Sequence, residues 1–209
     1  MESDAVSLLG TDRTSRVYGG RLCLALVNSV WWRRSDAPEE QLTGYPELVE
    51  FVAAAGWLPQ ADQLVRRASE NADEAARALR RALELREQLL AVFAACAAGD
   101  RPRDSALRGV ERFGAAGLSG LHLEPSDAGY RLGWTTTSLD LPAQQAAVSA
   151  MVLLAGPEIA RVKQCPGTTC GWVFLDVTRN RSRRWCNSAE CGNRSRVQAH
   201  YARTKAAAQ

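Results

Sequence analysis

Four of the six cysteines lie close together near the end of the sequence, in the pattern C-x4-C-x15-C-x4-C. They are Cys165, Cys170, Cys186 and Cys191. Two short-spaced pairs across a linker of this length are typical of a tetrahedral zinc site, in which four thiolates leave the metal no open position. So short a segment cannot bury enough surface to fold through its core alone. The sequence therefore predicts one structural Zn2+ on these four residues.

Other states of the thiols stay open. Disulfides need an oxidising compartment, whereas the polar N-terminal stretch has no signal-peptide pattern and the apolar runs are too short to span a bilayer. We therefore expect a cytoplasmic protein with reduced thiols and no membrane partner. An iron–sulfur cluster would accept the same ligands. Cys23 and Cys96 lie in apolar helical patterns and are interpreted as core residues.

The charge of the chain is divided unevenly along the sequence. Residues 161–209 hold ten Lys and Arg against two Asp and Glu, whereas residues 1–160 hold sixteen against twenty-one. Opposite net charges suggest two modules, and the basic one suggests a polyanionic partner. We place the boundary at about residue 160, with domains at 1–160 and 161–209.

Hydrophobic periodicity predicts an α+β protein that is predominantly α-helical. Helices are expected over 20–34, 46–59, 70–100, 101–117 and 142–156, and a β-hairpin over 121–137. A second short hairpin is expected between Cys170 and Cys186, followed by a helix after Cys191. A cysteine knuckle, a hairpin and a ligand-bearing helix together describe a treble-clef-like zinc finger.

The helix after Cys191 carries a polar stripe. At 100° per residue, Asn193, Arg196, His200 and Arg203 fall within about 80° of one another, and such side chains can contact base edges. Arginines of the preceding turn are expected to contact phosphates, while Val197 and Tyr201 cover the hairpin. The predicted partner is double-stranded DNA, and the predicted contacts are Arg179, Arg181, Arg183, Arg184, Asn193, Arg194, Arg196, His200, Arg203 and Lys205.

Arg86 projects from near the middle of the apolar stripe of the 70–100 helix. A buried guanidinium needs a partner, because an unpaired buried charge is costly. One interpretation is an ion pair within the same domain or an extended side chain that reaches the surface. The other is a pocket for an anionic small-molecule effector, formed by Asn28, Trp31, Trp32 and Arg86.

No catalytic constellation or glycine-rich phosphate loop can be identified, so we expect a binding protein rather than an enzyme. Two alternatives to DNA binding stay open: an RNA- or ribosome-associated protein that stacks bases on Trp172 or Trp185, and a zinc module that recruits an acidic protein. We expect these two tryptophans to pack the finger instead. Homodimerisation would suit paired half-sites on DNA, but nothing in the sequence requires it.

The string "CGWVFLDVTRNRSRRWCNSAECGNR" resembles the CGNR zinc-finger family. The segments "LCLALVNS", "ELVEFVAAAGWL" and "LRRALELREQLLAVF" are similar to the ABATE domain that usually precedes this finger. The resemblance implies a bacterial transcription regulator, in which a sensor-like domain is joined to a DNA-binding finger. Ala25 stands where the first motif commonly has an acidic residue, which puts a ligand or ion pair at that position in doubt; Asn28 is retained.

Overall fold

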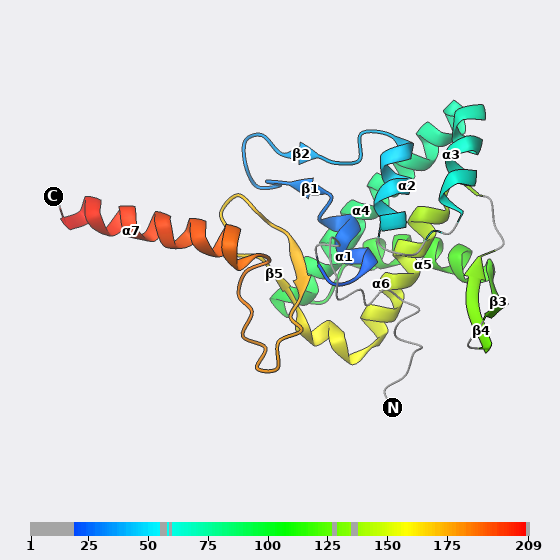
Figure 1. The fold of residues 1–209 in the computed structure, drawn as a ribbon. Coiled ribbons are helices and arrows are strands. Elements are labelled where there is room, and N and C mark those ends of the chain that lie inside the picture. Colours follow the sequence, from blue (N-terminus) through cyan, green and yellow to red (C-terminus); the bar gives the residue numbers. More distant parts are fainter. Residues whose placement is uncertain (1–18, 55–57, 59, 127–128, 135–137, 208–209) are drawn as a thin grey trace.

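The computed structural model describes residues 19–54, 58, 60–126, 129–134 and 138–207 (Figure 1). In chain order the helices of this part are α1 Leu22–Val27, α2 Tyr45–Ala54, α3 Ala61–Glu70, α4 Ala72–Ala98, α5 Asp104–Ser119, α6 Leu141–Ala155, the 3-10 helix η2 Pro157–Arg161, the π-helical turn η3 Ser188–Gly192 and α7 Asn193–Ala207. The strands pair as β1 Val30–Trp31 with β2 Glu39–Glu40, β3 Leu121–Ser126 with β4 Gly129–Trp134, and β5 Val162–Gln164 with β6 Val173–Leu175. The predicted fold class is confirmed.

Helix α4 forms the centre of the hydrophobic core. Its alanines and leucines recur every three or four residues, and this stripe is buried against α1, α2, α3, α5 and α6. Gly99 ends the helix in the left-handed conformation, with φ +81°. Helix α1 packs in the same core and has no exposed side, since all six residues of "LCLALV" are buried.

The strands beside the zinc cysteines belong to this main core. Val162 of β5 and Val173 and Leu175 of β6 are buried in one cluster with residues of α1 and α4. A second, smaller cluster consists of the four cysteines and Phe174, with Trp172 and Trp185 packed against it. The finger is therefore built onto the helical part of the chain, whereas α7 extends away from it (Figure 1).

Several local predictions were wrong. The helix expected over 20–34 ends at Val27, and Trp31 already lies in strand β1. No element was predicted over 61–70, where the structure has α3 with Leu64 and Ala68 buried. The other expected helices and the 121–137 hairpin are confirmed with shifted ends, since Leu58 is not helical and the 70–100 helix begins at Ala72. Residues 55–57, 59, 127–128 and 135–137 lie outside the described residues.

The prediction of a hairpin between Cys170 and Cys186 was wrong about the strand that pairs with β6. Strand β6 pairs with β5, which precedes Cys165, in the register Val162 to Leu175. The first cysteine pair therefore lies in the connection of the hairpin. No strand occurs over 176–185, all of which the structure describes.

Helices α5 and α6 pack closely at Gly117. A Cβ atom there would lie 2.8 Å from Cγ2 of Val148 and 3.0 Å from the carbonyl oxygen of Gln144. Because overpacking of this kind typically costs about 1–3 kcal/mol, Gly117→Leu should lower the free energy of unfolding in urea by that amount. Ala116→Leu, at an exposed neighbouring position, should change it by less than about 0.5 kcal/mol. Equal effects would contradict the close packing.

Within the described residues, no helix is long and apolar enough to cross a membrane.

Candidate metal centre and nucleic-acid interface

The four predicted cysteines come together from separate elements. Cys165 directly follows β5, Cys170 lies before β6, Cys186 follows the 176–185 loop, and Cys191 lies in η3. Their sulfur atoms all lie within 4.8 Å of one another. The sulfur of Cys186 is 3.5 Å from that of Cys170 and 3.6 Å from that of Cys191. Zinc–sulfur bonds of about 2.3 Å place tetrahedral sulfurs about 3.8 Å apart, so this geometry fits one structural zinc ion.

Local backbone structure holds the first pair. The Cys165 amide donates to the carbonyl of Trp172 at 2.7 Å, and the Cys170 amide to that of Gly167 at 3.1 Å. A Cβ atom at Gly167 would crowd the Cβ of Cys170 at 3.1 Å, and would lie in van der Waals contact with the sulfurs of Cys165 and Cys191 at 3.6 Å. The glycine thus lets the connection between β5 and β6 fold tightly over the sulfurs.

The second pair is held at the start of the last helix. Oδ1 of Asn187 accepts hydrogen bonds from the amides of Ala189 and Glu190 at 2.9 and 3.3 Å, which caps η3. Cys191 lies in this turn, and α7 begins two residues later. The helix predicted after Cys191 is therefore confirmed, and Cys191 itself lies in the π-helical turn that precedes it.

The cluster can carry four thiolates only with a cation among them. Hydrogen bonds from Cys170 and Cys186 lower the pKa of Cys165. The hydrogen bond with Cys165 in turn raises the pKa of Cys170, and hydrogen bonds with Cys165 and Cys170 raise the pKa of Cys186. Desolvation raises the pKa of Cys191. A bound divalent zinc favours the thiolate form of all four side chains, and its binding displaces the thiol protons.

The 176–185 loop is organised by Asp176, whose role the sequence reasoning missed. This fully buried carboxylate accepts hydrogen bonds from Nζ of Lys163 at 2.6 Å, from Oγ1 and the amide of Thr178 at 2.6 and 3.0 Å, and from the amide of Arg183 at 2.9 Å. Burial by itself disfavours the charge, but the hydrogen bonds from Lys163 and Thr178 hold the pKa of Asp176 well below its usual range. Asp176 is one of only two acids in 161–209, which was the available signal.

The contacts of Arg183 favour a structural role over the predicted phosphate contact. Its guanidinium donates to the carbonyls of Trp185 at 3.1 Å and Leu175 at 3.4 Å, and to that of Cys186. It also lies 4.6 Å from the centre of the Phe174 ring. Because these acceptors occupy the side chain inside the finger, we remove Arg183 from the set of expected DNA contacts.

Most of the other predicted DNA contacts lie on the surface. Asn193, Arg196, His200 and Arg203 of α7 are exposed, as are Arg179, Arg181 and Arg184 of the loop. The side chain of Lys205 lies outside the described residues. Val197 and Tyr201 were expected to cover the hairpin, but they are 44% and 70% exposed, because α7 extends away from the finger.

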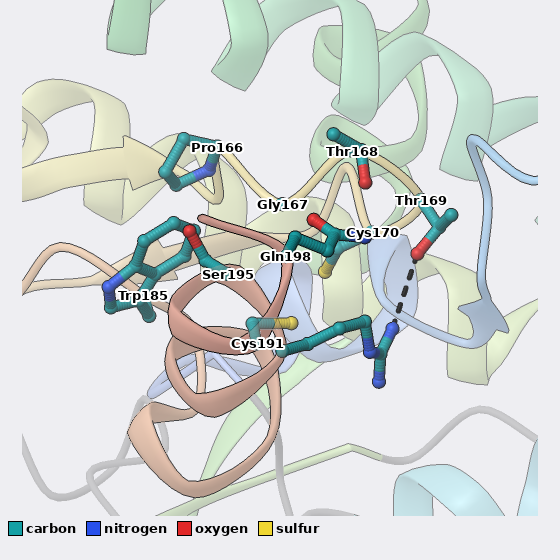
Figure 2. Close-up of a pocket in the computed structure, with 10 residues that line it drawn as sticks. Pro166, Gly167, Thr168, Thr169, Cys170, Trp185, Cys191, Ser195 and Gln198 are labelled. Carbon is teal, nitrogen blue, oxygen red and sulfur yellow. Dashed lines mark hydrogen bonds between the residues drawn. The ribbon is translucent and has the colours of Figure 1, made fainter. Parts of the chain in front are cut away.

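Arg194 of α7 contacts two other segments of the chain. Its guanidinium donates to Oγ1 of Thr169 at 3.2 Å and lies 4.1 Å from the ring centre of Trp32. Arg194 and Thr169 both line a small hollow between residues 166–170 and the start of α7, which Figure 2 shows with Thr169 labelled. The sulfurs of Cys170 and Cys191 face this hollow. Arg194 therefore joins α7 to the first cysteine pair.

The four residues predicted to form an effector pocket make contacts within the chain. Arg86 is buried and pairs with both carboxylate oxygens of Glu40 at 2.7 Å, which is the internal ion pair left open by the sequence. The buried amide of Asn28 donates to the Val173 carbonyl at 2.7 Å and accepts from the Val173 amide at 3.0 Å. Trp31 and Trp32 line a shallow apolar pocket with Trp172 and the zinc ligand Cys170. The contacts of Asn28 and the tryptophans tie the helical part to the finger. The contact of Arg86 with Glu40 favours the ion pair over an external anion.

The comparisons with known proteins agree with the two-part architecture that the resemblance implied. The ABATE family, described as "putative stress-induced transcription regulator", matches residues 20–157. The CGNR zinc finger matches residues 161–204. A search of curated proteins found no match. The ABATE model covers well over half of the sequence, so this chain belongs to the ABATE family and carries a CGNR zinc finger after its ABATE domain.

Proposed function

We propose that this chain regulates transcription by binding double-stranded DNA through α7 and the exposed arginines of the 176–185 loop. The observation that carries the proposal is the position of α7, whose polar stripe is exposed on a helix that extends from a zinc-organised base (Figure 1). The major groove of B-DNA admits one α-helix, and Arg and Asn can contact base edges there. The loop arginines lie next to that base and supply phosphate contacts.

The tryptophans of the finger favour duplex DNA over single-stranded RNA. The indole nitrogen of Trp172 donates to the Val30 carbonyl at 2.8 Å, and both Trp172 and Trp185 are half-buried against the cysteine cluster. Packed rings offer less surface for stacking bases than the exposed aromatics of RNA-binding proteins. An effector of the ABATE domain stays a prediction, without an assigned pocket.

Salt-dependent binding tests this proposal. The zinc-loaded chain should bind duplex DNA selected from a random pool, and its affinity should fall steeply with salt, whereas binding to single-stranded RNA should be weaker. Binding to neither polymer, or tighter binding to RNA, would contradict the proposal. Binding to neither would favour recruitment of an acidic protein instead.

Substitutions distinguish the proposed phosphate contacts of the loop from the proposed base contacts of α7. Replacing Arg179 and Arg181 together by alanine should reduce the slope of log affinity against log salt by about 1–2 on every duplex. Arg196→Ala should cost about 1–3 kcal/mol on the selected duplex and relax its sequence preference. The control is Arg77→Ala, which removes the same charge from an exposed position on α4 and should leave binding unchanged. A loss of binding in the control equal to that of Arg196→Ala would contradict the assigned surface.

A further inference from the structure

Residues 30–40, called the arm below, reach from the ABATE domain to the finger. The arm contains β1, β2 and their connection, and lies beside the finger in Figure 1. The Val30 carbonyl accepts from Trp172 at 2.8 Å, and the Arg34 amide donates to the Thr169 carbonyl at 3.1 Å. The Arg194 guanidinium lies over the Trp32 ring. The arm thus contacts both the first cysteine pair and the second residue of α7.

The other end of the arm is fixed to the core. Glu40 pairs with the buried Arg86 of α4, and Arg86 also donates to Oγ of Ser29, directly before the arm, at 3.0 Å. Glu40 further accepts from the Leu42 amide at 2.9 Å. Since these contacts hold both ends of the arm on one rigid helix, the arm can hold Trp32 in a defined place.

The backbone at Trp32 is unusual for a bulky residue. Its φ of +52° lies in the left-handed region, which such side chains rarely occupy without a compensating contact. At this position the ring meets the guanidinium of Arg194 at 4.1 Å, within the range of a cation–π interaction. The contact with Arg194 therefore compensates for part of the strain in the backbone at Trp32.

We propose that the stack of Trp32 on Arg194 sets the direction of α7 relative to the ABATE domain, so that Trp32 is a positioning residue for the nucleic-acid interface. The usefulness of that direction rests on the proposed function. Helix α7 has 15 residues, which makes it about 22 Å long, and a rotation of about 20° at its base would move its far end by about 8 Å. Without the stack, the contacts of α7 with its own finger limit its direction less strictly.

The direction of α7 can be measured without DNA. Spin labels on unnatural amino acids at exposed positions Ala199 of α7 and Arg80 of α4 leave the cysteines free for zinc. In the zinc-loaded full chain we expect a narrow distance distribution, which Trp32→Ala broadens and Trp32→Phe largely preserves, because Phe retains a face for the guanidinium. The control is Tyr130→Ala, which removes an exposed aromatic side chain from β4, outside the arm and the finger, and should leave the distribution narrow.

Zinc content and DNA affinity complete the test. All variants should retain one zinc per chain, which shows that the finger has folded. On a duplex that the wild type binds, Trp32→Ala should weaken binding about tenfold, and Trp32→Phe less than about threefold. A narrow distribution in Trp32→Ala would overturn the inference, as would an unchanged affinity despite a broadened distribution. If the wild type binds no duplex, the proposed function fails, whereas the distances still decide whether the stack directs α7.

Discussion

Replacement of Cys186 by serine is expected to remove both zinc retention and duplex-DNA binding while the ABATE domain stays folded. The Cys186 sulfur lies 3.5 Å from that of Cys170 and 3.6 Å from that of Cys191, and a serine hydroxyl is a poor ligand for a metal that prefers thiolates. Structural zinc contributes about 10–16 kcal/mol to the folding of small finger peptides, so its loss exceeds any contact that the finger makes by itself. The small cluster of four cysteines and Phe174 cannot compensate.

Loss of zinc should unfold only part of the finger. Val162, Val173 and Leu175 are buried in the main core, so β5 and β6 should persist, whereas η3, α7 and the 176–185 loop lose their fixed positions. Elemental analysis should find less than one zinc per chain, and circular dichroism should show the loss of about one helix. Cys96→Ser, at a half-buried thiol outside the cluster, should retain zinc and DNA binding. Full zinc occupancy in Cys186→Ser would contradict the four-cysteine site.

The metal site was predictable from the sequence because ligand spacing is a local property. The spacing of the four cysteines identifies them as ligands, because paired cysteines at such spacings are typical of zinc sites. The long helix α4 was predictable for the same reason, since its apolar stripe repeats over 27 residues. Both features depend on the spacing of residues within one segment of the sequence.

Contacts between distant segments were not predictable in this way. Arg86 was identified as a buried cation, but its partner Glu40 lies 46 residues earlier in a segment that reads as a polar loop. Arg183 was predicted to contact phosphate from its place in a basic segment. Its acceptors in the structure are backbone carbonyls, and a sequence pattern does not identify such acceptors. Strand β5 was missed because it has three residues, too few for a period-two pattern to be recognised.

Asp176→Asn is expected to destabilise the loop that carries the exposed arginines. Asp176 is fully buried and bonded to the ammonium of Lys163 at 2.6 Å. The asparagine amide cannot accept from both Lys163 and the Arg183 amide while it also accepts from Thr178. Breaking a buried ion pair costs about 3–5 kcal/mol, and because the Lys163 side chain is 35% exposed and can reach water, we expect about 3 kcal/mol.

Urea unfolding followed by tryptophan fluorescence measures this loss of stability. Because the pKa of Asp176 is depressed in the folded state, its contribution is fully present above the unfolded value of about 3.9 and is lost only as the pH falls through the folded value. The difference between variant and wild type should therefore be constant from pH 6 to pH 8. The control is Asp104→Asn, which breaks an ion pair whose side chains are 85% and 65% exposed and should cost less than about 1 kcal/mol. Equal losses in the two variants would mean that burial of Asp176 does not strengthen its pairing, and the loop would then depend on zinc alone.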